Sequence, residues 1–270
     1  MVRVLGRLYS ISMSRRKIPG SLAIFRLFGV DVYLHWSWFI VLAILIQLRA
    51  KQFSSGGLEA LAYFLTLFGI VLLHEFGHAL ASKSVGGQAD TILLMPLGGV
   101  AFIKPPPRPG AVLWGIVAGP LVNVLLIPVT ILLIVLLQIP VQIEWAELTG
   151  AQRYVISVAA INMMLLCFNL LPIYPLDGGQ ILQCLLWFLI GRARSLRIAA
   201  GIGFATAVIG GIATLLIGSI KPDERIWLLM IAIFLGLQAW KGYRTAGILA
   251  RIEHLEQTGE WAPYKVGSGR

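Results

Sequence analysis

An almost uninterrupted apolar run, Tyr63 to Leu73, leads directly into three ionisable side chains, His74, Glu75 and His78. Such a run can enter a bilayer, where ionisable groups are costly and mark functional sites. Histidines four residues apart lie on one face of a helix, one turn above the other. Two imidazoles placed in this way can bind one Zn²⁺, and the glutamate beside them can act as a general base. The alternative is a polar helix end at the membrane interface with a fortuitous spacing.

Composition extends the membrane interpretation to the whole chain. The 270 residues are 58% hydrophobic and 13% charged, whereas a soluble domain is roughly half apolar and a quarter charged. A helix of about 20 mostly apolar residues crosses a bilayer. The sequence therefore predicts an all-α polytopic membrane protein with about six transmembrane helices, and a shorter apolar run at 179–190 that continues a broken helix. The six predicted spans are 33–48, 58–80, 111–138, 153–171, 196–218 and 225–241.

Basic residues set the expected orientation, because lysine and arginine are concentrated in cytoplasmic loops. We expect one membrane-embedded domain over residues 1–270, with a basic cytoplasmic segment at 1–30 and a short cytoplasmic tail at 242–270. This places both termini in the cytoplasm. We expect the cell inner (plasma) membrane, and a thylakoid or organelle membrane is the alternative that the sequence leaves open. The net charge of +10 fits basic loops that face anionic lipid, and the apolar spans exclude a soluble nucleic-acid binder. The basic residues near the start are Arg3, Arg7, Arg15, Arg16, Lys17 and Arg26.

Two short apolar runs surround Gly98 and Gly99 between the second and third predicted spans. They are too short to cross as a helix and too apolar for a solvated loop, and the glycines favour a tight turn. We expect a re-entrant β-hairpin that dips toward the metal and is buried by protein. Its edge could bind an extended peptide by strand addition. A hairpin that only covers the site is the alternative.

A catalytic zinc site needs three protein ligands, and Asp177 is the candidate for the third. It follows Pro172 and Pro175, which interrupt the helix, and precedes Gly178 and Gly179, which allow close backbone approach. A carboxylate on such a broken segment is free to point at a partner helix. The alternative is an aspartate that caps the following helix, and the two roles can coexist.

Three asparagines occur in or beside the predicted spans. Asn123 could donate to a substrate carbonyl or to the oxyanion formed during attack, or it could join two helices, which is the more frequent use of a buried amide. Asn162 presents the same choice. Asn169 is expected to support the broken segment.

Four blocks of this sequence, in order, resemble the site-2 protease family of intramembrane zinc metalloproteases. They are His74–His78, Pro96–Gly99, Gly119–Asn123 and Asn169–Gly179, and the resemblance covers about 60–190. It implies that His74, His78 and Asp177 bind one zinc ion per chain and that Glu75 is the catalytic base. It also implies that the Gly98–Gly99 hairpin and Asn123 lie near the substrate.

The resemblance implies a zinc metalloendopeptidase that cleaves a transmembrane segment of another membrane protein, such as an anti-sigma-factor-like regulator. The sequence shows no insertion long enough for a PDZ domain, and the tail after about residue 242 is too short for paired CBS domains. A non-catalytic zinc-binding scaffold or a metal transporter is the competing class. Transport would require a polar path through several spans, and a pure metal carrier has no need for Glu75.

Overall fold

The computed structural model describes residues 18–49, 57–95, 98–140, 142, 144 and 147–258. The chain divides into two compact units, Met1–Lys104 and Pro105–Arg270. The expected cluster of basic residues before position 18 lies outside the described residues, as do Pro96 and Leu97 at the tip of the expected hairpin.

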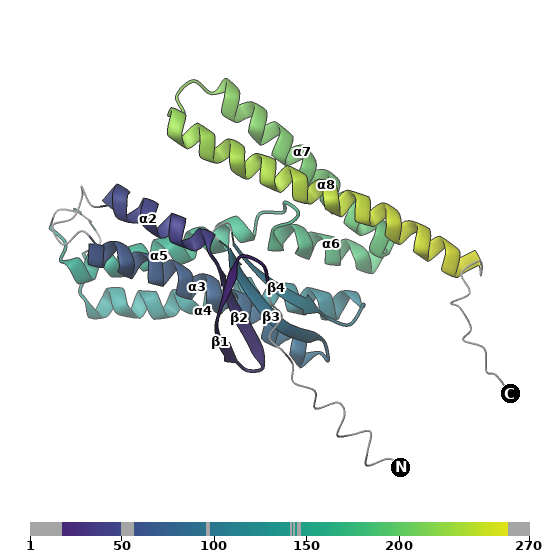
Figure 1. The fold of residues 1–270 in the computed structure, drawn as a ribbon, viewed down its shortest axis with the longest axis horizontal. Coiled ribbons are helices and arrows are strands. Elements are labelled where there is room, and N and C mark those ends of the chain that lie inside the picture. The colour runs from purple at the N-terminus through teal and green to yellow at the C-terminus, as the bar shows by residue number, and fades with distance from the viewer. Residues whose placement is uncertain are drawn as a thin grey trace, which may run out of the picture. The chain divides into compact units, whose positions relative to one another are not determined.

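The first unit contains a four-stranded sheet, which corrects the expectation of an all-α protein to a mostly helical one with a small sheet (Figure 1). The strand order follows the chain, and β2 and β3 pair in parallel while the outer pairs are antiparallel. The predicted hairpin is present as two antiparallel strands, and its re-entrant placement stays a prediction. The strands are β1 (Ser21–Leu27), β2 (Val30–His35), β3 (Gln88–Met95) and β4 (Gly98–Lys104).

The sheet begins inside the segment expected to be a basic N-terminal extension. Phe28 and Gly29 have φ of 51° and 73°, the left-handed values that a two-residue hairpin loop requires. On the strand that follows, Val30 and Val32 alternate inward and are fully buried, as residues i and i+2 of a strand do. This alternation next to a Phe-Gly turn is a strand signal, and the composition-based interpretation of residues 1–30 overlooked it.

Two helices complete the first unit, α2 (Ser37–Arg49) and α3 (Gly57–Ser84). The predicted span at 33–48 is divided between the end of β2 and α2, whose 13 residues are fewer than the about 20 that cross a bilayer. Trp38 anchors α2 on α3, because its buried ring contacts Phe64 edge-on at a centroid distance of 5.4 Å.

The second unit is entirely helical in the part that the structure describes. Helix α4 packs against α5 and α6, α6 packs against α7, and α7 lies along α8 (Figure 1). The broken segment predicted between two helices is present between Asn169 and Asp177. The helices are α4 (Pro109–Leu136), α5 (Gly150–Asn169), α6 (Asp177–Ile190), α7 (Arg192–Leu216) and α8 (Pro222–Thr258).

Five helices are long and apolar enough to cross a membrane among the described residues: α3 from Leu61, α4, α5, α7 and α8. They coincide with five of the six predicted spans, and the chain is a multi-pass integral membrane protein. Helix α8 continues to Thr258, so the first part of the expected tail at 242–270 is helical. It extends a span and does not form a separate loop.

Candidate metal centre

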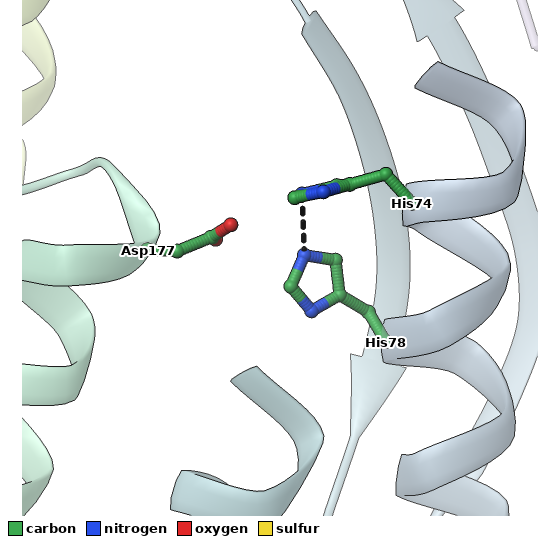
Figure 2. Close-up of side chains that lie close together, drawn as sticks. All are labelled: His74, His78 and Asp177. Carbon is green, nitrogen blue, oxygen red and sulfur yellow. Dashed lines mark hydrogen bonds between the residues drawn. The ribbon is translucent and has the colours of Figure 1, made fainter. Parts of the chain in front are cut away.

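Helix α3 carries His74 and His78 on successive turns, and both side chains are buried. The Nε2 atoms of the two rings lie 3.1 Å apart, with ring centroids separated by 4.7 Å (Figure 2). The rings are nearly perpendicular, at 84°. The four-residue spacing therefore brings one nitrogen of each imidazole to the same point beside the helix.

This separation fits a shared zinc ion. Zn–N bonds of about 2.0–2.1 Å in a tetrahedral site place two ligand nitrogens about 3.4 Å apart, close to the 3.1 Å between the Nε2 atoms. The two ligand atoms already lie close together beside an apolar helix, so they need little rearrangement to hold an ion. The donor set and geometry of this histidine pair therefore fit the metal that the sequence predicts.

Glu75 lies on the next position of α3 and is held by strand β4. Its Oε2 atom accepts a hydrogen bond of 3.0 Å from the backbone N–H of Ala101, and its side chain is buried. A charge-assisted bond from a fixed backbone donor orients a carboxylate strongly. The sheet thus sets the direction of the group that the sequence names as general base.

Gly99 is required at its position on β4 because Glu75 fills the space beside it. A Cβ atom added at Gly99 would overlap Cγ of Glu75 and would lie 2.6 Å from Oε1. The register of the hairpin creates this approach, since Leu94 pairs with Gly99 and Ile92 pairs with Ala101. Gly98 pairs with Met95 at the end of the same ladder. The sequence marked both glycines, whereas the contact with Glu75 needed the fold.

Asp177 is the first residue of α6 in the second unit, and only 8% of it is exposed. The cap position belongs to Leu176, which makes no side-chain cap hydrogen bond. Asp177 therefore does not occupy the capping position that the alternative assigned to it. A carboxylate in the first turn is favoured by the helix dipole.

Asn123 and Asn162 join α4 to α5. The amide nitrogen of Asn123 donates to Oδ1 of Asn162 over 2.8 Å, and the amide nitrogen of Asn162 donates to the backbone oxygen of Asn123 over 2.9 Å. Both side chains are almost completely buried. This pairing favours the helix-joining alternative for Asn123. Asn169 is the last residue of α5 and is half-buried.

Two features beside the histidines escaped sequence reasoning. The donor to Glu75 is a backbone N–H, which every residue except proline carries, so no residue type could have indicated it. Gly99 was expected near the substrate, whereas the structure places it against Glu75. Two short apolar runs around Gly98 and Gly99 signal the strands, but the pairing that brings Ala101 over α3 is a tertiary property.

Comparison with known proteins shows similarity to zinc metalloproteases. Residues 136–210 match the family model described as Peptidase family M50. A zinc metalloprotease of Methanocaldococcus jannaschii is 33% identical over 218 residues, which cover 81% of this chain and 60% of that protein. Stage IV sporulation protein FB of Bacillus subtilis is 30% identical over 141 residues, covering 50% of this chain and 43% of that protein.

A solved structure has the same fold. The site-2 protease from Methanocaldococcus jannaschii matches with a TM-score of 0.57 at 28% identity, covering 83% of this chain and 95% of that chain. This chain spans less than two thirds of the length of the curated relatives it matches. The resemblance inferred from the four sequence blocks is confirmed: the chain is similar to the site-2 protease family of zinc metalloproteases, peptidase family M50.

Proposed function

We propose that this protein is an intramembrane zinc-dependent endopeptidase in which His74, His78 and Asp177 hold the ion. The observation that carries the proposal is the 3.1 Å approach of the two histidine Nε2 atoms beside a glutamate fixed by a backbone donor. All three proposed ligands are buried, and each offers one ligand atom of a type that zinc accepts (Figure 2). Asp177, from the second unit, completes the set of three protein ligands.

His74, His78 and Asp177 would hold a zinc ion that, when bound, would supply a Lewis acid for the scissile carbonyl and would lower the pKa of a water molecule to about 7. Glu75 takes the proton from the attacking water and later transfers it to the leaving amine. The Ala101 N–H holds one oxygen of Glu75, so the carboxylate keeps its direction while the proton moves. Gly99 leaves the space that this carboxylate occupies.

The substrate that this arrangement suits is an extended peptide segment. A helical peptide bond is shielded by its own hydrogen bonds, so a transmembrane substrate must unwind locally before attack. Strand addition to the β3–β4 hairpin would hold the unwound segment beside Glu75, with Gly98 and Gly99 allowing backbone approach. The proposed substrate is the transmembrane segment of another membrane protein, for example an anti-sigma-factor-like regulator.

Topology completes the proposal. We place both termini on the cytoplasmic side of the cell inner membrane, with the hairpin re-entrant beside the metal. Termini on one side require an even number of crossings, so this topology needs a sixth crossing besides the five long helices. The whole of 1–270 then acts as one metalloprotease domain. Asn169, at the end of α5, supports the break before Asp177. Asn123 contributes by holding α4 on α5.

The competing function, a non-catalytic zinc scaffold or metal transporter, gives no reason for the arrangement around Glu75. A carrier needs neither a carboxylate aligned by the Ala101 N–H nor a glycine that leaves room for it. The hydrogen bond and the close glycine both serve a group that must keep one direction, which a general base requires.

The experiment compares wild type with Glu75→Gln in detergent, measuring zinc content and cleavage of a generic transmembrane substrate. Glutamine keeps an oxygen acceptor for the Ala101 N–H but cannot accept a catalytic proton. We expect about one zinc per chain in both proteins and a loss of cleavage of roughly 10²–10⁴-fold in the variant. Zinc in both and cleavage in neither, across several substrates, would favour the scaffold. Failure of the folded wild type to take up zinc would refute the metalloprotease.

A further inference from the structure

The segment between α5 and α6 is folded tightly onto the first turn of α6. A Cβ atom added at Gly178 would overlap the backbone oxygens of Leu170 and Leu171, and one added at Gly179 would overlap the backbone nitrogen of Tyr174. Contacts this close are possible only for glycine. The two glycines that follow Asp177 therefore act as the surface on which this segment rests.

Hydrogen bonds fix the same segment. The backbone N–H of Leu176 donates to the oxygen of Ile173 over 2.8 Å. The side-chain amide of Gln180 donates to the backbone oxygen of Pro175 over 2.9 Å. The residue directly before Asp177 is thus bound on one side to the segment and on the other to α6, whose Gln180 N–H donates to the Leu176 oxygen over 3.0 Å.

Tyr174 connects this segment to the last two helices. A Cβ atom added at Gly203 of α7 would overlap the backbone oxygen of Tyr174. A Cβ atom added at Gly242 of α8 would lie 2.5 Å from Cε1 of the Tyr174 ring and 3.0 Å from Cζ. Glycines from α7 and α8 therefore form a socket, here defined as Gly203 and Gly242, which receives one residue three positions before Asp177.

The helices that carry the socket form a paired element. Helix α7 lies along α8 (Figure 1), and the ring of Trp240, two residues before Gly242, contacts Phe204, one residue after Gly203, at a centroid distance of 5.7 Å. On the next part of α8, Arg197 of α7 donates from Nε and Nη2 to the hydroxyl of Tyr243 at 3.1 and 3.0 Å. These contacts lie on both sides of the socket and hold its two glycines in fixed relation.

We infer that Tyr174 is a positioning residue through which the α7–α8 pair fixes the metal-binding carboxylate of Asp177. Displacement of the ring would move a segment that is bonded directly to the first turn of α6, and Asp177 would move with it. This inference rests on the proposed function, because it takes Asp177 as a zinc ligand. It assigns α7 and α8 a role at the metal centre although neither helix supplies a proposed ligand.

The test uses full-length protein in detergent and measures the dissociation constant for Zn²⁺ and the absorption spectrum of the Co²⁺-substituted form. Gly242→Ala adds a methyl group against the ring of Tyr174, and Tyr174→Ala removes the ring. Gly247→Ala on the same helix is the matched control, because a Cβ atom there meets nothing within 4 Å. Tyr174→Phe keeps the ring and is the conservative variant. Asp177→Ala reports whether the carboxylate binds the metal at all.

Loss of a residue that orients a metal ligand typically lowers affinity 10–100-fold. We therefore expect the zinc dissociation constant to rise by about 10–100-fold in Gly242→Ala and Tyr174→Ala, with an altered Co²⁺ spectrum. Gly247→Ala and Tyr174→Phe should match wild type. In the double variant Gly242→Ala with Tyr174→Ala, the small residue at 174 leaves room for the new methyl group. Its thermal midpoint should recover relative to Gly242→Ala, while its zinc affinity should not.

The variants distinguish the role of Asp177 as a zinc ligand from the role of Tyr174 as its positioning residue. Unchanged zinc affinity in Asp177→Ala would refute the proposed ligand set. If Asp177→Ala binds zinc more weakly while Tyr174→Ala keeps the zinc affinity and Co²⁺ spectrum of wild type, the positioning role of Tyr174 is overturned and the ligand set stands. If Gly242→Ala fails to fold, Tyr174→Ala still decides, because it removes atoms and creates no overlap.

Discussion

The backbone N–H of Ala101 donates to Oε2 of Glu75 over 3.0 Å, across a sequence separation of 26 residues. The bond joins the edge strand of the sheet to the turn of α3 that carries the proposed base. The entropy of ordering this carboxylate is lost on folding, so it need not be lost again during the reaction. Strand β4 is therefore part of the structure that orients the proposed base.

Gly99→Ala should abolish cleavage while the protein retains zinc. The new Cβ atom would overlap the Glu75 side chain, so the carboxylate must leave its position while His74 and His78 stay on α3. We expect a loss of about 10²-fold or more in kcat, the scale of a general base. Gly69→Ala on α3, where a Cβ atom meets nothing within 4 Å, is the control. Full activity in Gly99→Ala would show that Glu75 does not need this space.

Asn123→Ala and Asn162→Ala should each destabilise the protein, because each removes a buried hydrogen bond between α4 and α5. We expect losses of about 1–2 kcal/mol in the free energy of unfolding in detergent. A double-mutant cycle should give a coupling energy of about 0.6–1.7 kcal/mol, the range for hydrogen bonds between membrane helices. A strong loss of kcat in Asn123→Ala, with an unchanged free energy of unfolding and no coupling to Asn162, would instead support Asn123 as a donor to the oxyanion.

Zinc should stabilise the wild type in a dose-dependent way. At a free concentration of about 100 times the dissociation constant, an ion bound only by the folded state adds about 2.7 kcal/mol to the free energy of unfolding. His78→Ala should lose this increment, whereas His254→Ala, an exposed histidine on α8, should keep it. Thermal unfolding with and without a chelator measures the difference. An equal zinc response in His78→Ala would remove that residue from the ligand set.

Phe28→Ala should loosen the β1–β2 hairpin without affecting the metal. The Phe28 ring meets Phe76 edge-on at a centroid distance of 6.4 Å, and such pairs contribute about 0.5–1.5 kcal/mol beyond area burial. The bond from Lys83 Nζ to the Phe28 backbone oxygen, 2.9 Å long, does not depend on the side chain and should persist. Hydrogen exchange of β1 should accelerate while zinc affinity stays constant. Unchanged exchange would show that the hairpin does not rest on Phe76.

Sequence patterns predicted the elements whose signal is local. Apolar length identified the five long helices, and the four-residue spacing of His74 and His78 predicted two rings on successive turns. The break before Asp177 follows from Pro172 and Pro175, because each proline removes a backbone donor and its ring crowds the preceding turn of a helix. In each of these cases the physics acts between residues close in the chain.

Strands β1 and β2 carry a local signal that a count of apolar and basic residues does not detect. Residues 21–35 contain a Phe-Gly turn followed by the alternating Val30-Asp31-Val32, but the basic residues before them and the apolar run after them predicted a basic extension and the start of a span. A count of apolar residues cannot separate a short strand followed by a 13-residue helix from a single crossing helix. The periodicity within the run, two for a strand and 3.6 for a helix, carries that distinction.

The sequence by itself determined the membrane class and the histidine pair and pointed to the proposed base and the candidate carboxylate, because these depend on side-chain chemistry and helical spacing. Only the tertiary structure decided that Ala101 orients Glu75, that Asn123 bonds Asn162, and that Tyr174 sits in the glycines of α7 and α8. The first and the third depend on backbone groups and on glycines that lack a side chain, and the second joins two side chains 39 residues apart in the sequence. Strand register and helix packing set them, and neither can be read from the residues at one position.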